Sequence, residues 1–101
     1  MSKGLQKIEQ LRSRIDNIDV RLVHLLNKRV TYAKAIGKVK SSLQMQVYSR
    51  KREKEVLRHV LAVSRGPLST TALRRLFGHI VNESRSAEHR QTTFQKQRKS
   101  G

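Results

Sequence analysis

A stripe of apolar residues recurs every three or four positions through the first quarter of the chain. Its members are Leu5, Ile8, Leu11, Ile15, Ile18, Leu22 and Leu25. Steps of three and four place such side chains on one face of an α-helix. Because the pattern continues past Gly37 as far as Val39, the sequence predicts one helix from about Leu5 to about Ser42. That helix would be about 55 Å long, more than a compact domain of this size can cover, so it requires a partner chain.

Two shorter helices are expected after it. The polar stretch SSLQMQ interrupts the apolar pattern and predicts a loop. Ser49 is placed to cap a second helix, which should end at the glycine-proline turn signal of residues 66–67. Ser69 or Thr70 is placed to cap a third helix, which we expect to run to about Arg90.

The predicted fold class is therefore all-α, with three helices per chain and a long first helix. A single helical domain is expected over residues 5–90. Residues 91–101, QTTFQKQRKSG, are polar, basic and aperiodic, and they predict a disordered tail.

Charge narrows the choice of ligand without deciding it. The chain has 23 Lys and Arg residues against 7 Asp and Glu residues, a net charge of +16. Such a surface attracts anions, either a nucleic acid or a small anionic metabolite. Only four aromatic side chains are available for stacking on bases, and no zinc-finger spacing occurs, so nucleic acid is the less favoured partner.

Other classes of function lack their chemical groups. The chain has no cysteine, which excludes disulfides and thiolate chemistry and favours a reducing compartment. No apolar run approaches the roughly 20 residues of a membrane span, so we expect a cytoplasmic protein without a membrane partner. The four histidines form no metal-ligand set, and no glycine-rich phosphate loop appears. We expect neither a metal nor a cofactor.

Two cations interrupt the apolar face of the first helix. The next step after Leu25 falls on Arg29, and Lys40 lies eleven residues further, within about 20° of the same face. These long side chains either reach out of an apolar seam into solvent or form an anion site in a groove. Arg12 lies 17 residues before Arg29, about 26 Å along the helix, so Arg12 can share a small ligand with it only from a second chain.

Further candidates lie on the other two helices. Arg52 and Glu53 are adjacent near the start of the second helix, where free backbone N–H groups favour an anion. Ser84 and Glu88 are four residues apart and share a face of the third helix. Taken alone, each pair is more typical of a solvated helix surface than of a binding site.

Taken together, these segments resemble the all-helical chorismate mutase family. The resemblance extends from Ile8 to His89, and it depends on the order and spacing of four stretches: LRSRIDNIDVRLVHLLNKR, AKAIGKVK, VYSRKREKEVL and LFGHIVNESRSAE. It implies an intertwined helical homodimer that converts chorismate to prephenate without a cofactor.

The resemblance also implies roles for individual residues. Arg29, with Arg12 of the partner chain, would hold the two substrate carboxylates. Lys40 would contact a carboxylate and the ether oxygen of the breaking bond, and Glu88 would face that oxygen. The remaining substrate-binding residues implied are Glu53 for the ring hydroxyl, Arg52 for charge and orientation, and Ser84 for a carboxylate.

Ser49 departs from the family pattern, which often has Asp at this position. If this position contacts the substrate through its backbone, a serine would suffice in place of the aspartate. The basic tail and the high positive charge are not features of the family.

Three other functions remain open at this stage. An isochorismate pyruvate lyase would use the same fold and the same carboxylate-binding residues. A basic helical nucleic-acid-binding protein is favoured by the charge alone, and its affinity would fall steeply with salt. A relative that binds ligand without turnover is disfavoured by the complete set of site residues.

Overall fold

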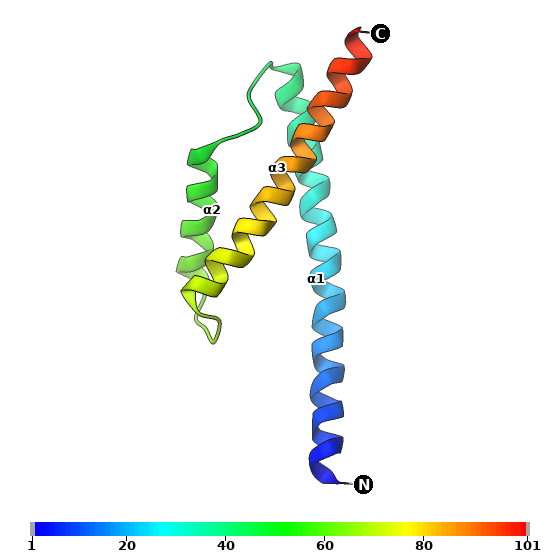
Figure 1. The fold of residues 1–101 in the computed structure, drawn as a ribbon, viewed down its shortest axis with the longest axis vertical. Helices are drawn as coiled ribbons and strands as arrows, with labels where there is room; N and C mark the ends of the chain where they lie inside the picture. Colours follow the sequence, from blue (N-terminus) through cyan, green and yellow to red (C-terminus); the bar gives the residue numbers. More distant parts are fainter. Residues whose placement is uncertain (1, 101) are drawn as a thin grey trace.

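The computed structural model describes the backbone of residues 2–100 and the side chains of residues 2–90. Three helices follow one another: α1 (Lys3–Ser42), α2 (Arg50–Val63) and α3 (Thr70–Ser100). No strand occurs among the described residues. The all-α class and the three-helix order predicted from the sequence are confirmed (Figure 1).

Helix α1 begins two residues earlier than the apolar stripe predicts. The Oγ of Ser2 accepts hydrogen bonds from the N–H groups of Gly4, at 3.1 Å, and Leu5, at 3.4 Å. These bonds satisfy donors that the first helical turn leaves free. The helix ends at Ser42, as predicted, before a turn in which Gln44 has a positive φ of 57°.

Serine side chains also begin the other two helices. Ser49 Oγ accepts from the N–H of Arg52 at 3.1 Å and caps α2, as predicted. Ser69 Oγ accepts from the N–H of Ala72 at 3.1 Å, which makes Ser69 the capping residue of α3 in preference to Thr70. Between the two helices Gly66 has a φ of 79°, a conformation that favours glycine.

The third helix extends beyond its predicted end. It continues to Ser100, whereas the loss of apolar periodicity predicts an end near Arg90. No Gly or Pro occurs between Gly78 and Ser100 to stop the helix. The helical backbone therefore continues after the apolar face has ended. The prediction of a disordered tail over residues 91–101 is not tested, because the side chains of residues 91–100 and the whole of Gly101 lie outside the described part of the chain.

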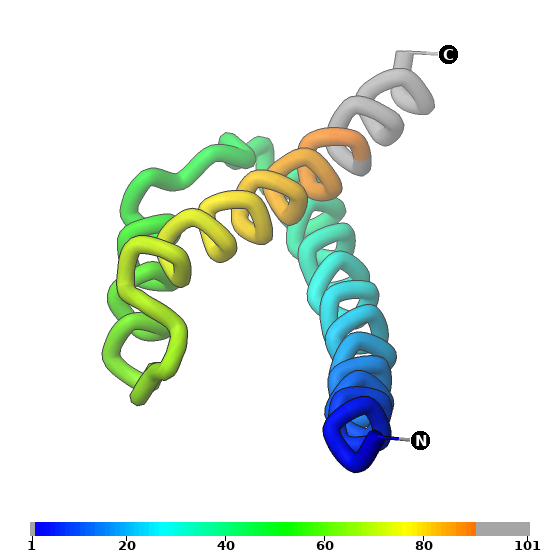
Figure 2. The backbone as a smooth tube through the Cα atoms, turned by 60° about the horizontal axis from the view of Figure 1, so that its bottom comes forward, coloured from blue at the N-terminus to red at the C-terminus, as the bar shows by residue number. Residues whose placement is uncertain are grey.

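Helix α3 crosses the carboxyl-terminal half of α1 at very close range (Figures 1 and 2). The contact is made by small residues, since Ala33, Gly37 and Ser41 are buried on α1 and Ala87 is buried on α3. A Cβ atom added to Gly37 would lie 2.6 Å from the backbone oxygen of Glu88. Glycine is therefore required for this helix crossing.

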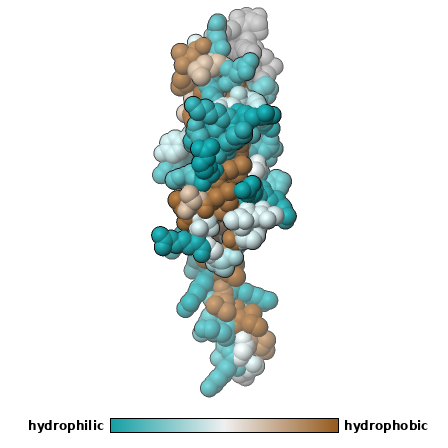
Figure 3. Space-filling view, turned by 90° about the vertical axis from the view of Figure 1, so that its left-hand side faces the viewer, coloured by the Kyte–Doolittle hydropathy of each residue, from teal (hydrophilic) through white to brown (hydrophobic). Residues whose placement is uncertain are grey.

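The amino-terminal part of α1 extends away from the rest of the chain. Every residue from 2 to 28 is exposed, including the apolar stripe, whose Ile15 is 54% and Leu25 is 62% exposed. Brown apolar atoms lie open along this stem in Figure 3. The chain consequently measures 66 × 29 × 15 Å, and it leaves uncovered the stripe that we expect a partner chain to bury.

Candidate functional site

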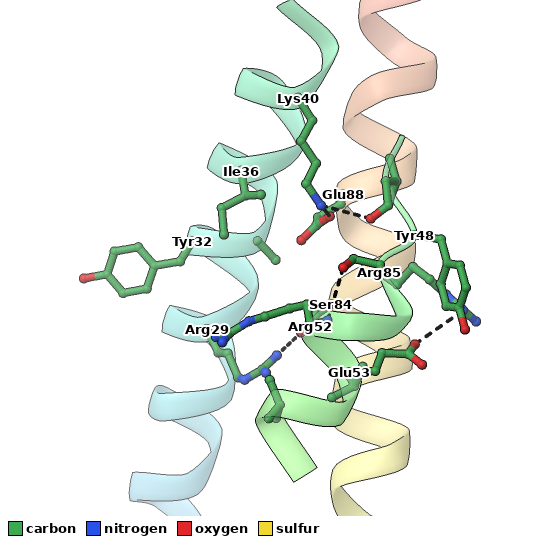
Figure 4. A pocket seen from close by; sticks show the side chains of 15 residues that line it. Arg29, Tyr32, Ile36, Lys40, Tyr48, Arg52, Glu53, Ser84, Arg85 and Glu88 are labelled. Atoms are coloured by element: carbon green, nitrogen blue, oxygen red, sulfur yellow. Dashed lines mark hydrogen bonds and ion pairs between the residues drawn. The ribbon is translucent and has the colours of Figure 1, made fainter. Parts of the chain in front are cut away.

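The three helices and the loop before α2 enclose a pocket of about 210 Å³ (Figure 4). Four cationic and two acidic side chains line it, so positive charge is in excess. The apolar part of the wall comes from both long helices and from α2. The lining residues are Arg29, Tyr32, Ala33, Ile36, Lys40, Val47, Tyr48, Ser49, Arg52, Glu53, Val56, Val81, Ser84, Arg85 and Glu88.

Lys40 and Glu88 face each other across the close crossing of α1 and α3. Lys40 Nζ donates to Glu88 Oε2 at 3.1 Å and to the backbone oxygen of Val47 at 2.9 Å. The two side chains are only 18% and 14% exposed. A largely buried lysine that is held by two acceptors is a well-positioned donor toward a ligand.

Arg29 lines the same pocket as Lys40, from the same face of α1. Its Nη1 donates to Ser84 Oγ, which itself donates to the backbone oxygen of Ile80 at 3.0 Å. Burial lowers the pKa of Arg29, the nearby charge of Arg52 lowers it further, and Glu88 opposes both effects. A guanidinium stays charged in proteins, so Arg29 and Arg52 repel each other in the pocket. An anionic ligand bound between them would relieve this repulsion.

The start of α2 supplies a third group of polar side chains. Arg52 lines the pocket but is 71% exposed, and its Nη1 lies 3.5 Å from Glu55 Oε2. Glu53 is 31% exposed and lies 3.5 Å from Arg85 Nη1. Ser49 also lines the pocket, but its Oγ is occupied in capping the helix, so a side-chain contact with substrate stays a prediction.

The structure brings together all but one of the residues singled out from the sequence. The exception is Arg12, which lies on the free stem of α1, is 69% exposed and pairs with Glu9 at 3.2 Å. The distance of about 26 Å from Arg29 on one helix explains why a single chain cannot place both in one pocket. A contribution of Arg12 across chains stays a prediction.

Arg85 and Tyr48 are among the lining residues that the sequence did not single out as site residues. Arg85 follows Ser84 directly and shares the face of α3 that carries Val81 and Glu88, so helical spacing alone could have included it. Tyr48 precedes Ser49 in the loop, and its ring lies 4.9 Å from the Arg85 Cζ atom. Nothing in the local sequence pattern indicates that contact, because it joins a loop to a helix almost forty residues later.

Two absences hold for the described part of the chain. No group of three or more His, Cys, Asp and Glu side chains there is placed to hold a metal ion. Within the same residues, no helix has the length and apolar character needed to cross a membrane.

Comparison with known proteins identifies relatives over most of the chain. The sequence model of the family described as chorismate mutase type II matches residues 11–89. A bifunctional chorismate mutase/prephenate dehydratase of Neisseria gonorrhoeae is 37% identical over an alignment of 87 residues, and the match covers 82% of this chain and 24% of that protein. A protein of the same description from Aquifex aeolicus is 30% identical and also shares 24% of its length. The chain thus spans about a quarter of the length of these curated relatives.

Solved structures of nearly the same length are also similar. A chorismate mutase of Thermus thermophilus, in its form II, superposes with a TM-score of 0.82 at 32% identity, covering 84% of this chain and 97% of that one. A conserved hypothetical protein of Pyrococcus furiosus superposes with a TM-score of 0.68 at 35% identity, covering 87% of this chain and 99% of that one. The helical fold is therefore shared along almost the entire length of these structures.

Proposed function

This chain belongs to the chorismate mutase type II family, and we propose that it catalyses the rearrangement of chorismate to prephenate in aromatic amino-acid biosynthesis. The observation that carries the proposal is the pocket in which Arg29, Lys40, Glu53 and Glu88 converge from three helices. Chorismate is a cyclic diacid with a ring hydroxyl and an ether bond. Each of these groups has a chemically suitable partner in that pocket.

The reaction is an intramolecular Claisen rearrangement, in which one carbon–carbon bond forms as the ether carbon–oxygen bond breaks. No proton transfer or covalent intermediate is required. An enzyme accelerates it by holding the compact chair-like conformer and by stabilising charge that develops on the ether oxygen. The protein needs rigid ion-binding side chains for this, and no nucleophile.

Arg29 suits the first task. Its planar guanidinium binds a carboxylate through two parallel hydrogen bonds, and its contact with Ser84 fixes its orientation before substrate arrives. In this proposal Ser84 also bonds a carboxylate, and Arg12 of a second copy binds the other end of the diacid. Glu53 accepts from the ring hydroxyl, while Arg52 beside it contributes positive charge.

Lys40 and Glu88 suit the second task. The ether oxygen becomes more negative in the transition state than in the substrate, so a donor aimed at it favours the transition state selectively. Lys40 Nζ, already held by the Val47 carbonyl, would donate to that oxygen. Glu88, which accepts from the same ammonium at 3.1 Å, would face that oxygen as well and keeps the ammonium in position.

A homodimer in the cytoplasm is part of the same proposal. The exposed apolar stripe of α1 supports the dimer, because a second copy of the same stripe would cover it and would bring its own Arg12 toward this pocket. The absence of cysteine from the sequence supports the location.

The test is an assay of the purified chain with chorismate and, separately, with isochorismate, with the products identified. The proposal expects prephenate from chorismate and no pyruvate release. Pyruvate from isochorismate with chorismate unchanged would identify the lyase instead. If neither substrate were consumed, the proposed activity would be rejected.

A further inference from the structure

Arg85 lines the pocket, yet none of the roles described above uses it. Its guanidinium is in contact with three separate elements. Nη1 lies 3.5 Å from Glu53 Oε1 on α2, Nη2 donates to Asn82 Oδ1 on α3 at 2.8 Å, and Cζ lies 4.9 Å from the ring centroid of Tyr48 in the loop. Figure 4 shows the Arg85, Tyr48 and Glu53 side chains gathered at one side of the pocket, away from Arg29.

This arrangement restrains Glu53. A glutamate near the start of a helix and 31% exposed has several rotamers open to it, and many of them direct its carboxylate into solvent. A guanidinium is a planar donor with fixed geometry, so its own anchoring by Asn82 and Tyr48 limits where the carboxylate can lie. Arg85 thereby keeps an oxygen of Glu53 at the pocket wall.

The contact also links the loop to the pocket. Tyr48 lies between Val47, whose carbonyl accepts from Lys40, and Ser49, which caps α2. A cation over the tyrosine ring attracts it with the ring quadrupole and so holds this loop segment against α3. One arginine therefore contacts two separate segments of the pocket wall, the loop at Tyr48 and helix α2 at Glu53.

We infer that Arg85 is the positioning residue for Glu53 and that it sets the preference of this site for a ligand bearing a ring hydroxyl. The inference rests on the proposed function, which gives Glu53 the hydroxyl as its partner. Arg85 touches no reacting atom. It acts by fixing the carboxylate that binds the hydroxyl.

The fold does not depend on this ion pair. Arg85 is 42% exposed, and ion pairs that reach solvent contribute little to stability. Arg85→Ala should therefore unfold at nearly the temperature of the unchanged protein. If that variant does not fold, Arg85→Gln retains most of the side-chain length without the charge and replaces it in every measurement below.

The first measurement compares kcat and KM of Arg85→Ala with those of Arg75→Ala. Arg75 is an exposed arginine on the same helix that does not line the pocket, so it controls for lost charge. We expect kcat/KM for chorismate to fall about tenfold in Arg85→Ala, the scale of one hydrogen bond to a charged group, and to stay unchanged in Arg75→Ala. Arg85→Lys, which keeps the charge but not the planar fork, should recover part of the loss.

The second measurement is a double-mutant cycle with Glu53→Gln. If Arg85 acts through Glu53, the loss caused by Arg85→Ala largely disappears in the Glu53→Gln background. The same loss should disappear with a chorismate analogue whose ring hydroxyl is methylated. A full tenfold loss in either case, or no loss in Arg85→Ala itself, would overturn the inference.

Failure of the proposed function would look different. In that case the unchanged protein would neither turn over chorismate nor bind a bicyclic dicarboxylate mimic of the transition state in calorimetry. An active, mimic-binding protein whose Arg85 and Glu53 substitutions are additive would reject the role of Arg85 alone.

Discussion

Arg29 is the residue on which the site depends most at the scale of single side chains. It combines partial burial, an oriented contact with Ser84 and an unfavourable neighbour in Arg52. These features are poorly explained by a long side chain that merely reaches out of an apolar seam. They are consistent with a cation held ready for an anion.

Arg29→Ala should reduce kcat/KM by on the order of a hundredfold to a thousandfold, the scale for removal of one preorganised charged donor. The helical circular dichroism signal and its melting temperature should hardly change, because this side chain contributes little to packing. A parallel loss of helix content and activity would instead favour a structural role for Arg29.

Glu88→Gln should retain most of the chorismate turnover. A hydrogen-bond donor stabilises an oxygen that gains negative charge, and an amide N–H supplies one from the position of the Glu88 carboxyl group. Glu88→Ala supplies no donor there and should lower kcat. Steady-state kinetics of the two variants measure this difference, and equal kcat values for them would rule out this role for Glu88.

Residue identities at the site were largely predictable because helical spacing is regular. Arg29 and Lys40 share a face of α1, and Ser84 and Glu88 share a face of α3, so one-dimensional periodicity indicates both pairs. Periodicity does not indicate which residue of α1 faces which residue of α3. The Lys40–Glu88 contact and the grouping of Arg85 with Tyr48 depend on how helices cross, and no local pattern specifies that.

The α1–α3 crossing is the decisive contact at the scale of elements. Its close approach at Gly37 brings Lys40 to Glu88, one turn further along α1. The helix stripe in the sequence showed that Gly37 does not end the helix. It did not show that the missing Cβ is needed for packing, because that reason lies in the backbone of α3.

Gly37→Ala should destabilise the fold by about 1–3 kcal/mol, the usual cost of overpacking, and should lower activity by moving Lys40 away from Glu88. Gly78→Ala is the matched control, since nothing lies within 4 Å of the Cβ it would add. That change should stabilise helix α3 by about 0.5–1 kcal/mol, because glycine is a weak helix former. Urea unfolding measures both, and equal effects of the two substitutions would contradict the packing argument.

Helix boundaries followed the sequence where a specific side chain sets them. Ser49 caps α2 as its position predicts, and α1 ends at Ser42, just before the polar stretch that predicts a loop. The end of α3 did not follow, because loss of an apolar face does not itself break a helix when Gly and Pro are absent.

At the scale of the whole molecule, the single chain is too extended to be self-sufficient. Its radius of gyration is 18.6 Å, whereas a compact domain of about 100 residues has a value near 13 Å. The stem of α1, where residues 2–28 are all exposed, contributes to this excess. The apolar stripe predicted both the length of this helix and the need for a second chain to bury it. Periodicity within one chain cannot predict how two chains pack against each other.

The central claim is that each pocket is completed by a second chain, with Arg29 from one copy and Arg12 from the other acting on one diacid. The most direct measurement mixes separately inactive Arg12→Ala and Arg29→Ala proteins, allows subunits to exchange and assays prephenate formation. Random exchange at equal amounts makes half of the dimers mixed, each with one intact site, so about a quarter of the activity of the unchanged protein should return. No recovery after subunit exchange has been verified would contradict the account.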